Sequence, residues 1–104
     1  MGAAGHTLAA LFARLAGEVA EVTSADVLEA TEYRRGARTF AVVEGRAADV
    51  RLNPEVAEAA RRTSYTTLST RGPGWVRFEP PSVDEFAMDR AGAWFLSAWR
   101  AAER

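Results

Sequence analysis

The feature that most constrains the fold of this chain is residues 71–78, which read Arg-Gly-Pro-Gly-Trp-Val-Arg-Phe. Glycine reaches positive φ angles and proline fixes φ, so the Gly-Pro-Gly at 72–74 predicts a sharp turn. The aromatic and β-branched residues that follow favour a pleated surface. Side chains alternate along a strand, so Trp75 and Arg77 are expected on one face, with Val76 on the other. The segment predicts a turn and a strand that complete a small antiparallel sheet.

Composition limits the chain to one folded domain. It has 104 residues, of which 48% are hydrophobic and 26% charged, as is ordinary for a globular protein. It contains no cysteine, which excludes disulfides and thiolate chemistry. No apolar run is long enough to span a membrane, and the N-terminus does not read as a signal peptide. We therefore expect a cytoplasmic protein with one domain over residues 1–104, of which 1–6 are flexible.

Three helices are predicted. The first covers residues 7–20, where apolar residues recur at the spacing of one helical face. The second begins at Asn53-Pro54, a favourable N-cap followed by proline in the first turn, and continues to about residue 62. The third begins at a capping box, Ser82 with Glu85, and continues to about residue 102.

The strands are predicted from short β-branched and aromatic runs. Residues 22–25 are ambiguous, 34–38 are expected to form a hairpin loop, and 63–70 form either a loop or a strand around 65–68. The predicted strands are residues 27–33, 39–43, 49–52 and 75–78. Together with the helices they predict an α+β fold, a single two-layer domain in which the helices pack on one face of an antiparallel sheet.

The last predicted helix has an apolar arc wider than one sheet face requires. One stripe includes Phe86 and Trp94, and an adjoining stripe includes Phe95 and Trp99. Two explanations remain open. The N-terminal helix packs on the second stripe, or this helix forms a partner or homodimer surface.

The order of these elements is similar to that of the MmcQ/YjbR-like family. The resemblance covers roughly residues 26–104. It implies a frataxin-like α+β fold and, because family members are often labelled DNA-binding, nucleic-acid binding. The segments that carry it are Thr-Phe-Ala-Val-Val at 39–43, Asp-Val-Arg-Leu-Asn-Pro-Glu-Val-Ala at 49–57, Gly-Trp-Val-Arg-Phe at 74–78, and the helix over 83–100.

The sequence offers little for catalysis. His6 is the only histidine and precedes the first helix, and no nucleophile elbow or phosphate-binding glycine pattern is present. The carboxylate pairs, such as Asp84 with Glu85, fall in helix first turns or on helix faces, where capping and the helix dipole explain them. We therefore predict no catalytic residue, no metal and no cofactor, and favour a protein that is not an enzyme.

Arginine forms the best constellation for binding. The basic residues are all arginine, and residues 34–78 hold nine of them against four acidic residues. Arginine forks suit anions, and arginine beside tryptophan suits an aromatic ligand. The predicted ligand-binding residues are Arg51, Trp75, Arg77, Arg71, Arg35 and Arg38.

The sequence thus predicts a small non-catalytic binding module with an arginine-rich sheet face. Its expected partner is an anionic or aromatic ligand, or another protein. The alternatives are a nucleic-acid-binding protein, and a homodimeric structural protein that associates through its C-terminal helix. A basic middle of the chain that is neutralised by its acidic ends is also compatible with the charges.

Overall fold

A computed structural model describes residues 7–103 of the chain. Residues 1–6, which include His6 and were expected to be flexible, lie outside the described residues. The elements are α1 Leu8–Ala16, β1 Val22–Val27, β2 Ala30–Arg35, β3 Arg38–Glu44, β4 Ala47–Arg51, α2 Pro54–Arg61, β5 Thr66–Leu68, β6 Trp75–Phe78 and α3 Glu85–Ala101.

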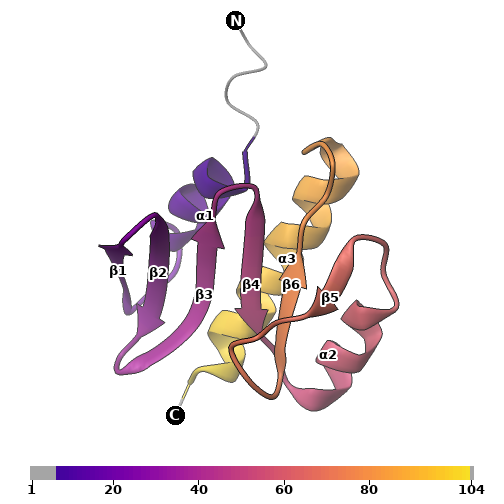
Figure 1. The fold of residues 1–104 in the computed structure, drawn as a ribbon. Coiled ribbons are helices and arrows are strands. Elements are labelled where there is room, and N and C mark those ends of the chain that lie inside the picture. Colours follow the sequence, from indigo (N-terminus) through magenta and orange to yellow (C-terminus); the bar gives the residue numbers. More distant parts are fainter. Residues whose placement is uncertain (1–6, 104) are drawn as a thin grey trace, which may run out of the picture.

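The strands form one antiparallel sheet in the order β1-β2-β3-β4-β6-β5. Helices α1 and α3 cover one face of this sheet, and α2 packs near its far edge, against β5 and β6 (Figure 1). No helix of residues 7–103 covers the opposite face, which we call the open face (Figure 1). The predicted α+β fold with helices on one side of an antiparallel sheet is confirmed.

The first hairpin differs from the prediction. Residues 22–27 form strand β1, and β2 occupies 30–35 instead of 27–33. The turn between them contains no glycine or asparagine. Leu28 takes the left-handed region instead, with φ 58°, and its side chain is 99% exposed. Leucine rarely takes this conformation, and hairpin turns usually have glycine or asparagine there. The sequence therefore did not predict this hairpin.

The start of the last helix also differs. The N-cap of α3 is Asp84, whose carboxylate accepts a hydrogen bond from the Ala87 N–H at 2.9 Å. Ser82 lies two residues before this position, so the predicted capping box is wrong. The aspartate satisfies a free N–H group of the first turn and also suits the positive end of the helix.

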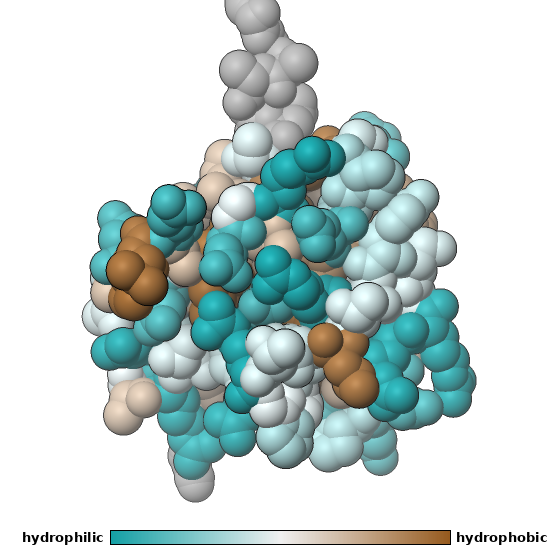
Figure 2. Space-filling model, in the orientation of Figure 1, coloured by the Kyte–Doolittle hydropathy of each residue, from teal (hydrophilic) through white to brown (hydrophobic). Residues whose placement is uncertain are grey.

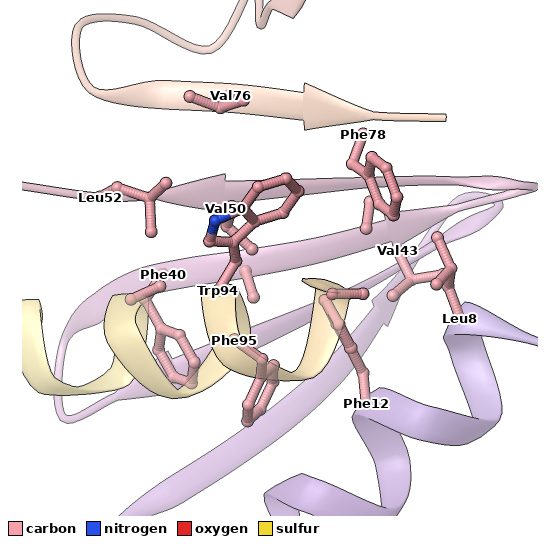
Figure 3. Close-up of a cluster of buried hydrophobic side chains, with 14 of the residues drawn as sticks. Leu8, Phe12, Phe40, Val43, Val50, Leu52, Val76, Phe78, Trp94 and Phe95 are labelled. Atoms are coloured by element: carbon pink, nitrogen blue, oxygen red, sulfur yellow. The ribbon is translucent and has the colours of Figure 1, made fainter. Parts of the chain in front are cut away.

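The core lies between the sheet and the helices α1 and α3 (Figure 3). Phe12 from α1 and Phe95 from α3 are fully buried, with ring centroids 4.7 Å apart. In the register of β2 with β3, Tyr33 opposes Ala41 and Arg34 opposes Thr39, which leaves Phe40 unpaired. This β-bulge lets Phe40 and Ala41 both enter the core. The adjoining apolar stripe of α3 therefore packs against α1. This is the first of the two explanations that the sequence left open for the wide apolar arc of this helix.

In the part of the chain that the structure describes, no helix has the length and apolar character needed to cross a bilayer.

Candidate functional site

Three of the predicted binding residues share the open face. Arg51 on β4 is directly opposite Trp75 on β6, and Arg77 on β6 is opposite Asp49 on β4. Directly opposed residues of antiparallel strands project to the same side. Burial follows the same alternation, because Val76 is buried in the core while Trp75 and Arg77 are half-buried. Figure 2 shows that this face is mostly hydrophilic, with two small separate hydrophobic spots.

Asp49 lies on this face but was not among the predicted binding residues. The alternation of side chains along β4 directs it to the same side as Arg51, yet only 2% of it is exposed. Its carboxylate accepts hydrogen bonds from Arg71 Nε at 2.9 Å and from an Arg77 terminal nitrogen at 3.2 Å. A buried carboxylate needs such partners. Two of the predicted anion-binding arginines therefore already hold an anion of the protein.

The remaining charges of this part of the open face are also balanced. The Arg77 guanidinium lies 3.6 Å from the Glu44 carboxylate and 3.9 Å from that of Glu79. On β2, Arg34 pairs with Glu32 at 3.2 Å. The three arginines of this region, residues 34, 71 and 77, thus face four carboxylates, those of Glu32, Glu44, Asp49 and Glu79. The arginine-rich sheet face predicted from the sequence therefore also carries carboxylates that pair with its arginines.

Arg35 does not join the open face. Its guanidinium stacks 4.0 Å from the centre of the Trp99 ring on α3 and donates a hydrogen bond to the Trp99 carbonyl at 2.9 Å. It also pairs with Glu21 at 3.2 Å. Arg35 on β2 thus stabilises the packing of the last turns of α3 against the sheet. This is a structural role. The predicted grouping of Arg35 with the other arginines is wrong.

Arg38, the first residue of β3, and Arg51, the last residue of β4, lie at the same end of the sheet. Both line a cleft of about 240 Å³, together with the polar side chains of Thr39 and Asn53. Its other walls are apolar and include Pro73, Gly74 and the last turn of α3. Among residues 7–103, no carboxylate side chain lines this cleft. Within residues 7–103, neither arginine has a carboxylate partner within 4.0 Å.

The Gly-Pro-Gly turn builds one wall of the cleft. The Leu52 N–H donates to the Gly74 carbonyl at 2.9 Å, which holds the turn against the end of β4. Gly74 has φ 82°, and a Cβ atom there would approach the Leu52 carbonyl oxygen to 3.0 Å. Only glycine accommodates both the angle and this approach. The turn therefore serves the shape of the cleft as well as the start of β6.

Asn53 also faces the cleft with an uncommitted amide. It occupies the N-cap position of α2, as predicted, but its side chain makes no capping hydrogen bond. An amide can donate to an anion beside the two guanidiniums. In the described part of the chain, the cleft lining includes no histidine, aspartate or glutamate. Its guanidinium groups are compatible with an anion, since they match carboxylate and phosphate oxygens.

Among the described residues, no group of three or more histidine, aspartate or glutamate side chains is arranged to hold a metal ion. The fold and the cleft define a small α+β domain with an anion-compatible cleft at one end of an open sheet. Comparisons with protein-family models, with curated proteins and with solved structures find no match.

Proposed function

We propose that this protein is a non-catalytic binding module that takes a small anionic ligand in the cleft between Arg38 and Arg51. One observation carries the proposal. These two arginines line the same cleft without a carboxylate partner among residues 7–103, whereas Arg71 and Arg77 on the open face are paired with Asp49. A cationic cleft beside a charge-balanced surface favours a compact anion over an extended polyanion.

The four carboxylates of the open face argue against the nucleic-acid alternative. A nucleic-acid backbone lying across the sheet would place its phosphates near Glu44 and Glu79, and like charges repel. The cytoplasmic location, the homodimer alternative and the membership of the MmcQ/YjbR-like family stay predictions from the sequence.

Calorimetric titration with inorganic phosphate at low ionic strength tests the proposal. We expect Arg38→Gln and Arg51→Gln each to weaken binding about tenfold, since a hydrogen bond to a charged group contributes roughly 1.5–3 kcal/mol. Arg14→Gln is the matched control, because Arg14 lies exposed on α1 and pairs with Glu18. The proposal fails if neither phosphate nor sulfate binds, or if all three variants lose affinity equally.

A further inference from the structure

Trp75 does not line the cleft itself but is the cross-strand neighbour of Arg51, one of the two arginines of the proposed anion site. It opposes Arg51 across β4 and β6, and opposed Cβ atoms in such pairs are about 5 Å apart. Its indole is half-buried on the open face, outside the main core. Arg71 lies 5.9 Å from the ring centre, and Gly72 presents no side chain toward it. Arg51 thus contributes to the cationic cleft and is also the neighbour of the Trp75 indole.

We propose that the ligand is a heteroaromatic phosphate monoester, of which a nucleoside monophosphate is the simplest representative. The phosphate binds between Arg38 and Arg51, and the ring stacks on Trp75. This inference rests on the proposed function and adds the ligand class to it. Stacking on tryptophan is tolerant of ring identity because every base has a π-face. Two guanidinium forks match the double negative charge of a phosphate monoester.

The surroundings of the cleft limit the ligand to a single phosphate. Beyond Arg51 on the open face, the neighbouring cationic groups are Arg71 and Arg77, both of which Asp49 already pairs with, and Glu44 and Glu79 flank Arg77. A second phosphate that extended in this direction would meet carboxylates rather than free arginines. The charges therefore disfavour di- and triphosphates as well as nucleic acid.

The size of the cleft agrees with this arrangement. Its volume of about 240 Å³ is below the range of roughly 300–1,000 Å³ that encloses a drug-sized ligand. A phosphate and the adjoining sugar atoms occupy it, and the aromatic ring lies outside, on the sheet. This division assigns the phosphate to one pair of residues and the ring to Trp75, so the two contributions can be measured separately.

The experiment compares AMP, ribose 5-phosphate and adenosine by calorimetric titration against the full-length protein. We expect AMP to bind about tenfold more tightly than ribose 5-phosphate, because stacking of one base contributes about 1–3 kcal/mol, and tenfold is 1.4 kcal/mol. Adenosine alone should bind more weakly than AMP. Trp75→Leu should remove the advantage of AMP and leave the affinity for ribose 5-phosphate unchanged, which also shows that the variant is folded. Trp75→Phe should restore part of the advantage.

Arg51→Gln should weaken AMP and ribose 5-phosphate by the same factor. Equal affinities of AMP and ribose 5-phosphate in the unmodified protein would overturn the ligand class while the anion site stands. Tighter binding of a twenty-nucleotide oligothymidylate than of AMP, with a steep salt dependence, would overturn it in favour of nucleic acid. If none of the phosphates binds, the proposed function itself fails, and this inference with it.

Discussion

Asp49 determines the electrostatics of the open face more than any other residue. It is 2% exposed and is held by Arg71 and Arg77, whose side chains are each 31% exposed. Replacement by asparagine keeps the size but removes the charge that both guanidiniums face. Because the arginines can turn toward water, we expect Asp49→Asn to lower the free energy of unfolding by about 2 kcal/mol, less than the 3–5 kcal/mol of a fully buried pair.

Urea denaturation followed by circular dichroism measures this loss. Glu58→Gln is the control of equal charge change, because Glu58 is exposed on α2 and pairs only with the exposed Arg61 and Arg62. Exposed pairs contribute little, so the control should stay within about 0.5 kcal/mol of the unmodified protein. Equal stability of Asp49→Asn and the unmodified protein would show that the ion pairs of Asp49 with Arg71 and Arg77 do not contribute to the free energy of unfolding.

Tyr33 makes the stability of the fold depend on pH at the alkaline end. Burial raises the pKa of its phenol above 10.0, and the negative charge of Asp26 adds to the effect. The folded state therefore keeps a proton that the unfolded state loses. The resulting stability is present in full below pH 10 and is lost as the pH rises from there through the higher pKa of the folded state.

We expect Tyr33→Phe to flatten the decline of the unfolding free energy above about pH 10, because phenylalanine has no proton to lose. Urea titrations at several pH values measure this slope. An unchanged slope in Tyr33→Phe would mean that other groups cause the alkaline loss.

At the scale of elements, patterns within a few residues were predictive and long-range contacts were not. The alternation of β6 placed Trp75 and Arg77 on one face, and the Gly-Pro-Gly turn marked where that strand begins. The stacking of Arg35 on Trp99 joins residues 64 positions apart, so no local pattern encodes it. The same holds for Asp49, whose partner Arg71 lies 22 residues away. Charge balance on a sheet face follows from strand order, which a single sequence does not display.

The N-cap of α3 offers a direct test of one such local difference. The Asp84 carboxylate receives the Ala87 N–H at 2.9 Å, and Ser82 lies outside the helix. We expect Asp84→Ala to cost about 1 kcal/mol of unfolding free energy, and Ser82→Ala to cost almost nothing. Thermal and urea denaturation of the two variants compare them directly. A larger loss for Ser82→Ala would restore the capping box that the sequence favours.

At the scale of the whole molecule, the sheet is unevenly protected. Strands β3 and β4 lie in the middle of the strand order, and α3 packs against both. Eight of their twelve residues are buried. Strand β1 lies at one edge, and five of its six residues are exposed. Few buried apolar contacts hold this edge, so it should open without disrupting the rest.

We therefore expect amide hydrogen exchange to divide the sheet into two classes. Amides that are hydrogen-bonded in β3 and β4 should exchange only through global unfolding, with an opening free energy equal to that from urea denaturation. Those of β1 should exchange through local opening with a free energy several kcal/mol lower and little dependence on dilute urea. Exchange followed by NMR at increasing urea concentrations separates the two. If β1 shows the same opening free energy and urea dependence as β3, the whole sheet opens as one cooperative unit.

The Arg38–Arg51 cleft lies where β3 begins and β4 ends, so protection of these strands also means that the proposed site stays formed until the domain unfolds.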